Sequence, residues 1–315
     1  MTDLSLPRRA AARPLSLPRT WPRPDYRVAA GLLIAAVAWL VIVALSEPFG
    51  RWWWGTAQDA RSYWSPTLAD PYAHASWTTP SAYVYSPAFL QLVAPLALLP
   101  WQAFVAAWTG ILLGALRFLT GPRLLAIGVL FAVPELIGGN ISLLLAVAIV
   151  AGFRWPAAWA FVLLTKVTPG IGLLWFALRG EWRSLAIAVG ATFAIFLGSA
   201  IFMPAAWTDW LAVLTDAAGR SATWAALPVP FLARLPIALA VVAWGAQTNR
   251  RWTVPVAAMI ALPALWYGGL SMLLAVIALR GDWTDAEGNE SGAGPETAAL
   301  SRRHRRQAET APAGA

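Results

Sequence analysis

The sequence predicts an all-α fold: a polytopic transmembrane helical bundle of about ten spans, with broken helices and a long first outer loop. Composition is the first support. Of the 315 residues, 59% are hydrophobic and 12% are charged, whereas a soluble domain has about 25% charged residues. The second support is a succession of apolar runs. Many of the 20 tryptophans lie near the ends of these runs, as in the aromatic belts of membrane proteins.

The elements follow in order along the chain. The first span is expected at 28–46, and a polar, aromatic-rich loop at 47–82 follows it. Further apolar runs lie at 83–99, 101–119, 123–137, 141–153, 156–178, 184–202, 231–246, 252–265 and 266–279, with a second long loop at 203–230. Several runs are shorter than the ~20 residues of a normal span. Gly-Gly, Pro-Gly and Trp-Pro breaks interrupt them, and such breaks are tolerated at membrane depth where they line a protein cavity.

The two ends of the chain differ from this middle part. Residues 1–27 contain six arginines and five prolines, and residues 281–315 are polar and include the cluster RRHRR. Both are predicted to be disordered cytoplasmic tails, so that 28–280 forms the transmembrane domain. Arginine placement predicts the orientation, because cytoplasmic loops are enriched in positive charge. It puts both long loops outside a plasma membrane, at the cost of also placing Arg117, Arg123 and Arg154 there.

Composition also excludes several classes of function. The chain has no cysteine and two histidines, which excludes thiol catalysis and argues against a transition-metal site. No phosphate-binding glycine loop, dinucleotide fingerprint or hydrolase motif occurs, so no cofactor is predicted. The net charge of +8 lies mainly in tails and loops, which favours contact with anionic lipids over nucleic acid.

The single lysine, Lys166, is the strongest candidate for a functional charge. It lies inside the apolar run AAWAFVLLTKVTPGIGLLWFAL, where an ammonium costs roughly 2.5–3.5 kcal/mol to insert. Pro169 interrupts the same helix and frees backbone groups. Lys166 is therefore predicted to hold an anion such as a phosphate, and the alternative is a snorkelling lysine with no ligand.

Two carboxylates and one imidazole in the first long loop are candidates for acid–base chemistry. Asp59, in the segment GTAQDARSY, could act as a general base, or it could cap a helix or pair with Arg61. Asp70 precedes a proline, which favours a turn. His74 could titrate near neutrality, although a lone loop histidine is more often incidental.

Other polar residues lie beside the apolar runs. Tyr83 and Tyr85 open the run that follows the loop, where they could anchor the helix or stack on a sugar ring. Glu135 is the one acid well inside an apolar stretch, next to the break Gly138-Gly139-Asn140. An intramembrane carboxylate is a functional candidate, and the alternative is a structural ion pair with Lys166 or an arginine.

The order of these motifs resembles glycosyltransferase family 87, the polyprenyl-phosphate-mannose-dependent mannosyltransferases of the GT-C superfamily. The resemblance spans roughly residues 28–210. It rests on Asp59 and Tyr63 after the first span, then Tyr83, Tyr85 and Pro87, the stretch Pro95 to Pro100, the Gly-Gly-Asn break, Lys166 with Pro169, and the turn Arg179 to Arg183. One departure is that Gly139 stands where the family has glutamine.

The resemblance implies an inverting hexosyltransferase of GT-C-like fold with an extracytoplasmic active site. Asp59 would be its catalytic base, and mannose would pass from a polyprenyl-phosphate donor to a lipid or glycan acceptor. The predicted substrate-binding residues are Lys166, Arg61, Tyr63, Tyr85, Glu135 and Asn140. Two alternatives stay open: a transporter or flippase of a lipid-linked anion, which the broken helices and intramembrane charges also suit, and a non-catalytic scaffold.

Overall fold

A computed structural model describes residues 30, 33, 57–65, 70–73, 75, 82–218 and 229–280. Within these ranges the protein is helical and has no β-strand, which confirms the all-α prediction. Almost all of the predicted first span lies outside the described residues, as do both predicted tails and His74. The domain boundaries therefore stay predictions.

The helical elements follow one another closely along the chain. In order they are α2 (Gln58–Trp64), α3 (Pro87–Ala97), α4 (Trp101–Phe131), α5 (Val133–Gly138), α6 (Ser142–Gly152), η1 (Pro156–Ala158), α7 (Trp159–Thr165), η2 (Thr168–Leu173), α8 (Leu174–Leu178), α9 (Trp182–Phe202), α10 (Pro204–Ala218), α11 (Phe231–Thr248), α12 (Thr253–Ile260), η3 (Gly268–Leu274) and α13 (Ala275–Arg280). The η elements are short 3₁₀ segments. Many breaks therefore separate short helices, as the sequence predicts.

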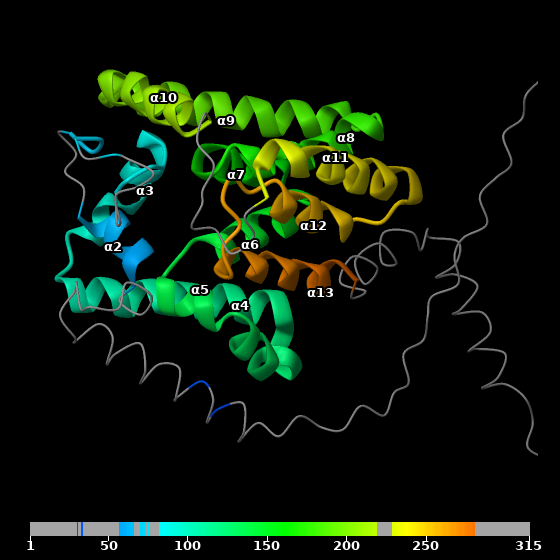
Figure 1. The fold of residues 1–315 in the computed structure, drawn as a ribbon, viewed down its shortest axis with the longest axis horizontal. Helices are drawn as coiled ribbons and strands as arrows, with labels where there is room; N and C mark the ends of the chain where they lie inside the picture. Colours follow the sequence, from blue (N-terminus) through cyan, green and yellow to red (C-terminus); the bar gives the residue numbers. More distant parts are fainter. Residues whose placement is uncertain are drawn as a thin grey trace, which may run out of the picture.

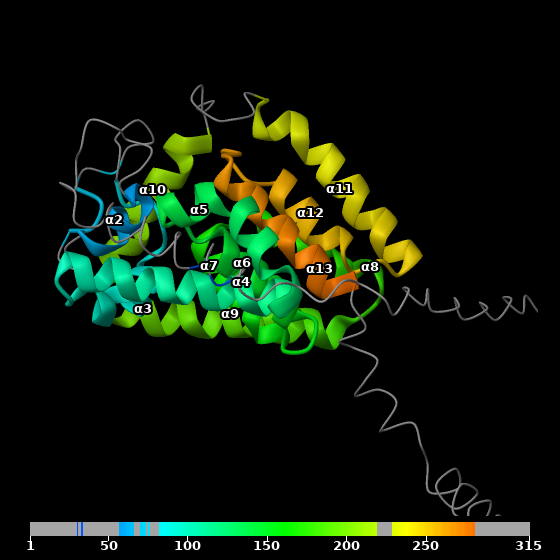
Figure 2. The ribbon, with the colours of Figure 1, turned by 90° about the horizontal axis from the view of Figure 1, so that it is seen from below.

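The helices form one bundle around α6 and α7. In Figure 1, α9 and α10 run along one side and α4 with α5 along the other, while α6, α7 and α12 lie between them. Figure 2 shows the same bundle after a quarter turn, with α2 and α3 again at the end away from α11. The short helix α2 is thus at one end of the bundle, where it reaches α3, α4 and α5.

Among the described residues, three helices are long and apolar enough to cross a membrane: α4, α9 and α11. Five shorter apolar segments accompany them, so the predicted count of about ten spans is not confirmed. Helix α9 buries only Ala188 and Ser199 and leaves large apolar residues such as Phe193 and Ile201 exposed. Such a surface is expected where a helix faces lipid.

The predicted break between the runs 101–119 and 123–137 is present as a kink inside α4. Gly121 has a non-helical backbone there, with φ 65° and ψ 177°, and Pro122 follows it. Glycine adopts this positive φ without a Cβ penalty. The second run ends earlier than predicted, because α4 stops at Phe131 and α5 begins at Val133.

The segment 203–230 was expected to be a loop, and for its first part this prediction was wrong. Its first part forms α10, a 15-residue helix that begins at Pro204. Trp207 and Trp210 are three residues apart and therefore share one helix face. Their indoles donate to Ser199 Oγ and to the Val84 carbonyl, both at 3.2 Å. Burial of these two rings explains why a segment of modest hydrophobicity is ordered.

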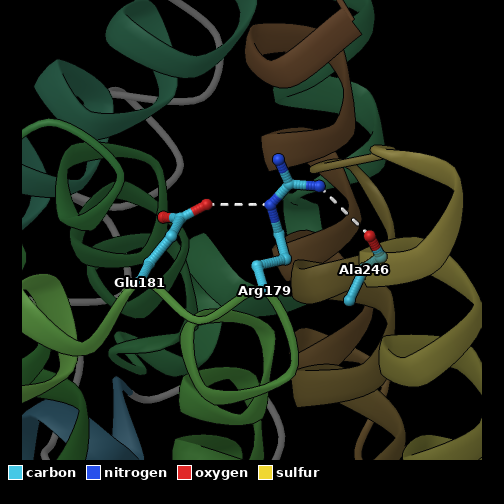
Figure 3. A network of polar contacts seen from close by, with 3 residues as sticks. All are labelled: Arg179, Glu181 and Ala246. Carbon is cyan, nitrogen blue, oxygen red and sulfur yellow. Dashed lines mark hydrogen bonds and ion pairs between the residues drawn. The ribbon is translucent and has the colours of Figure 1, made fainter. Parts of the chain in front are cut away.

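The Arg-rich turn between α8 and α9 is tied to α11 (Figure 3). Arg179 Nε lies 2.8 Å from Glu181 Oε1, and its Nη1 donates to the Ala246 carbonyl at 3.1 Å. This arginine therefore joins two elements that are far apart in sequence. A partly exposed ion pair contributes up to about 1 kcal/mol, so its main effect is on geometry.

Arg234 is a second arginine with a structural role. It is 4% exposed, and its guanidinium donates to the carbonyls of Val229, Ile260, Leu262 and Pro263. Three of these carbonyls belong to the end of α12 and the turn after it. Because they lack helical partners, Arg234 replaces the missing donors and fixes α11 against this turn.

Candidate active site

Helix α2 is held against the break between α5 and α6. The Ala57 amide, just before α2, donates to the Ile137 carbonyl at 3.1 Å. Ala57 has a left-handed backbone with φ 49° and ψ 45°, a conformation that costs an ordinary residue roughly 1–2 kcal/mol. The surrounding contacts therefore hold the chain in a turn that aims Asp59 towards the break.

The break itself depends on Gly139. This glycine ends α5 with φ 66°, and its amide donates to the Glu135 carbonyl at 2.9 Å. A Cβ at this position would stand 2.7 Å from Ala60 Cβ in α2. Glycine is thus needed both for the backbone conformation and for the close approach of α2. The Trp108 indole donates to the Gly139 carbonyl at 2.7 Å and completes the support.

Replacing Gly139 by alanine is expected to lower the free energy of unfolding by at least about 1–2 kcal/mol, the cost of left-handed backbone alone. The added methyl also pushes α2 away, so the position of Asp59 relative to the break should change with stability. Gly114→Ala in α4, where a Cβ meets nothing within 4 Å, is the matched control. Thermal unfolding in detergent would measure both variants, and equal stability of the two would contradict the role assigned to Gly139.

Asn140 follows the break and joins Asp59 to Lys166. Its Nδ2 donates to Asp59 Oδ2 at 2.7 Å, and its Oδ1 accepts from Lys166 Nζ at 3.3 Å. The Ile141 amide donates to the same Oδ1 at 2.6 Å. An amide N–H and an ammonium are both donors only, so the oxygen of Asn140 must face them. Its NH₂ group consequently faces the carboxylate.

Lys166 occupies the break between α7 and η2. Its backbone is extended, with φ −135° and ψ 108°, and its amide closes α7 on the Val162 carbonyl. The residue is partly buried, and Nζ lies 6.0 Å from the centre of the Tyr85 ring. Among the residues that the structure describes, no carboxylate oxygen of Asp59 or Glu135 lies within ion-pair distance of Lys166 Nζ. The direct Glu135–Lys166 ion pair that the sequence analysis considered is therefore not formed.

Asp59 combines partial exposure with a largely apolar setting. Burial raises the pKa of the Asp59 carboxyl above its ordinary value of 3.8, while the Lys166 charge and the Asn140 hydrogen bond act in the opposite direction. A raised pKa makes the ionised carboxylate a stronger base. The residue as a whole is not fully buried, which suits a base that must meet a substrate hydroxyl.

Glu135 is fully buried and holds the start of α6. Its Oε1 accepts the Leu143 amide at 3.1 Å, while Oε2 has no hydrogen-bond partner and faces the Cα of Gly268. A Cβ on residue 268 would stand 2.7 Å from that oxygen. A carboxylate at a helix N-terminus satisfies free amide groups and suits the helix dipole. Glu135 therefore supports the break rather than facing an open surface.

The predicted tyrosines form a buried aromatic wall beside the charged residues. The hydroxyls of Tyr63 and Tyr85 lie 3.1 Å apart, and the Tyr72 hydroxyl donates to the Tyr85 carbonyl at 2.6 Å. The ring of Tyr63 also packs against Phe89 and Trp108. Tyr63 shares a helix face with Asp59, four residues before it, so the wall and the carboxylate are positioned together.

The remaining loop candidates lie apart from this group. The Arg61 guanidinium lies 4.5 Å from the centre of the Trp64 ring and 5.0 Å from that of Trp101. Arg61 is two residues after Asp59 in α2, so the two side chains point to different sides of the helix. Asp70 is an exposed residue at a turn, as its proline neighbour predicts.

Two contributors escaped the sequence analysis. Trp108 was one of many tryptophans, and nothing in the sequence marks its contact with Gly139. Ser86 had a signal, because a serine before a proline is typical of a helix start. Its Oγ accepts from the Phe89 amide at the start of α3 and donates to the Leu164 carbonyl near the end of α7. It thereby holds α3 against the segment that carries Lys166.

The charged groups do not resemble a metal site. In the described part of the chain, no three His, Cys, Asp or Glu side chains come together in a way that could hold an ion. The group of Asp59, Asn140 and Lys166 instead offers an acceptor of protons beside a fixed positive charge. Such a pair suits a reaction in which a hydroxyl loses a proton and an anion leaves.

Comparison with protein families gives one match. Residues 83–284 match glycosyltransferase family 87. The matched segment covers more than half of the chain and contains Glu135, Asn140 and Lys166, but it begins after Asp59. Neither the curated proteins nor the solved structures gave a match. The role of Asp59 is therefore argued from its contacts with the matched segment.

Proposed function

Since the chain belongs to glycosyltransferase family 87 and is thus a membrane glycosyltransferase, we propose that it transfers mannose from a polyprenyl-phosphate donor to a lipid or glycan hydroxyl. The reaction would take place on the outer face of the plasma membrane. One observation carries the proposal. The carboxylate and the ammonium of two incompletely buried residues lie in one hydrogen-bonded group, Asp59–Asn140–Lys166.

In the proposed reaction Asp59 is the general base. It takes the proton of the acceptor hydroxyl, whose oxygen forms a bond to the anomeric carbon of the sugar. The bond from that carbon to the phosphate oxygen breaks, with inversion, and the polyprenyl phosphate leaves with the electron pair. A single displacement with one carboxylate needs no covalent sugar–enzyme intermediate.

Lys166 is proposed to stabilise the departing phosphate. An ammonium has three donors, and one of them points to Asn140 at 3.3 Å. The other donors can meet phosphate oxygens, and the fixed charge favours the transition state as negative charge develops there. Tyr85 belongs to the buried aromatic wall, and its ring centre lies 6.0 Å from the ammonium, so it lines the proposed phosphate site on one side. Arg61 is assigned no phosphate contact, because it packs on Trp64 and Trp101.

Transfer by the purified enzyme would test the function directly. The protein is incubated in membrane lipids with radiolabelled polyprenyl-phosphate mannose, and lipid and glycan products are separated. We expect label to move to an acceptor only when active enzyme is present. A parallel donor carrying glucose tests the choice of sugar. Loss of donor without a labelled product, or movement of intact donor between leaflets, would contradict transfer.

The loop that carries Asp59 is expected to face the outside. The chain has no cysteine, so a single Ala73→Cys, at an exposed turn position, gives a unique label site. An impermeant maleimide should modify it in intact cells. Gln247→Cys at the opposite predicted side is the matched control and should react only after permeabilisation. The reverse pattern would invert the topology.

A further inference from the structure

We propose that Asn140 is a spacer: its side-chain amide keeps Lys166 from pairing directly with Asp59. In this way the ammonium remains available for a donor phosphate, and the carboxylate remains free to accept a proton. The catalytic consequences rest on the proposed function. The spacing itself is a property of the folded chain and can be measured without substrate.

The hydrogen bonds of Asn140 carry the proposal. The amide lies between the two charges, 2.7 Å from Asp59 Oδ2 through Nδ2 and 3.3 Å from Lys166 Nζ through Oδ1. No direct contact of 4 Å or less joins the two charges in this described region. The Ile141 amide holds Oδ1 at 2.6 Å, so rotation of the side chain would break three hydrogen bonds at once.

Glu135 keeps the spacer in place from the other side of the break. Its main-chain carbonyl accepts the amides of Gly139 at 2.9 Å and Asn140 at 3.3 Å. Its buried side chain accepts the Leu143 amide in the first turn of α6. One residue thus holds the end of α5 and the start of α6, which are the two elements flanking Asn140. Glu135 acts on the site through Asn140 and is a positioning residue.

The charges around Asp59 show why the distance matters. Besides burial, the Lys166 charge and the Asn140 hydrogen bond act on the pKa of Asp59. The other titratable groups near Asp59 are Glu135, Tyr63 and Tyr85, whose pKa values its charge affects, and Arg61 lies on its own helix. Lys166 is the one cation among those from other elements. A cation in direct contact lowers the pKa of an aspartate by about 1–3, and a less basic carboxylate is a poorer proton acceptor. Separation by one amide limits this effect.

Asn140→Ala is the first test. Without the amide, the flexible lysine is expected to close onto Asp59. The pKa of Asp59 then falls, so the acid limb of kcat/KM moves to lower pH by about one unit or more. The donor KM should rise at least about tenfold, because the ammonium is occupied. If Asn140 only donates a hydrogen bond to Asp59, its loss should raise the pKa of Asp59. The acid limb of kcat/KM would then move to higher pH, and this result would overturn the proposal.

Two further variants make the result specific. The double variant Asn140→Ala/Lys166→Met has no ammonium that could approach Asp59. The acid limb of its kcat/KM profile should therefore move to higher pH, whereas that of Asn140→Ala should move to lower pH. Asn140→Asp preserves the volume, so it is the safer choice for folding. Its new carboxylate should pair with Lys166 and raise the donor KM. An unchanged donor KM in Asn140→Asp would also overturn the proposal.

A titration that does not use activity separates this proposal from the proposed function. In protein with ¹³C-labelled aspartate carboxyls, the Asp59 signal is the one that disappears in Asp59→Asn. Its titration midpoint should fall in Asn140→Ala and rise in the double variant. These two midpoint shifts would support the spacer whatever the activity of Asp59→Asn. Sugar transfer by Asp59→Asn would refute only the role of Asp59 as the base. Equal midpoints in all three proteins would refute the spacer.

Discussion

Asp59→Asn is expected to abolish sugar transfer while the protein still folds. General bases typically contribute a factor of about 10²–10⁴ to the rate, so kcat should fall by at least about a hundredfold. The asparagine keeps an oxygen that can accept the bond from Asn140 Nδ2, so the group around it stays assembled. Single-turnover transfer from labelled donor measures the loss.

The fold should survive because the charge of Asp59 is unfavourable in its site. Its pKa in the folded protein lies above the ordinary value of 3.8. The folded state therefore binds the proton more tightly, and stability decreases as pH rises from about 4 through the folded pKa. A neutral side chain avoids this cost at pH 7. Asp70→Asn, at the exposed turn, is the matched control and should leave transfer unchanged. Near-normal turnover by Asp59→Asn would exclude it as the base.

Lys166→Met is expected to weaken donor binding strongly. A hydrogen bond to a charged group is worth roughly 1.5–3 kcal/mol, which corresponds to about a 10- to 150-fold rise in the donor KM. Lys166→Arg should restore binding only in part, because the planar guanidinium is bulkier than the compact ammonium. Steady-state kinetics with a series of donor concentrations would separate the effect on KM from that on kcat.

A double variant tests whether Lys166 instead serves to neutralise Glu135. If it did, Lys166→Met alone would destabilise the protein by leaving a buried carboxylate unpaired, and adding Glu135→Gln would restore fold and activity together. The structure argues against this, since Glu135 contacts the Leu143 amide and the ammonium contacts Asn140. Full activity of the double variant would sink the assignment of Lys166 to the phosphate.

The sequence predicts the fold class well because hydrophobic runs and sparse charge leave few alternatives. It also predicts the breaks, since Gly139 and Pro169 have local conformational effects that neighbours rarely override. Helix α10 was missed. It is ordered by Trp207 and Trp210 against distant partners, and local propensity does not carry that information.

The site could be predicted as a set of residues but not as an arrangement. Lys166 and Glu135 stand out because charge is costly in an apolar run. Their partners do not stand out. The bond from Asn140 to Asp59 joins positions 81 residues apart, and the left-handed turn at Ala57 has no signature in the sequence. Likewise, the sequence does not show that the Glu135 side chain holds the start of α6, and its binding of substrate stays a prediction.

The docking of α2 on a later part of the chain also sets an order of events during biosynthesis. A seven-residue helix is too short to be stable alone, and its supports Ile137, Asn140 and Lys166 are made after it. At about 5–20 residues per second, Lys166 leaves the ribosome roughly 5–20 seconds after Asp59. During that interval the α2 segment lacks the later residues on which it packs. The site can therefore form only after the chain has been made as far as Lys166.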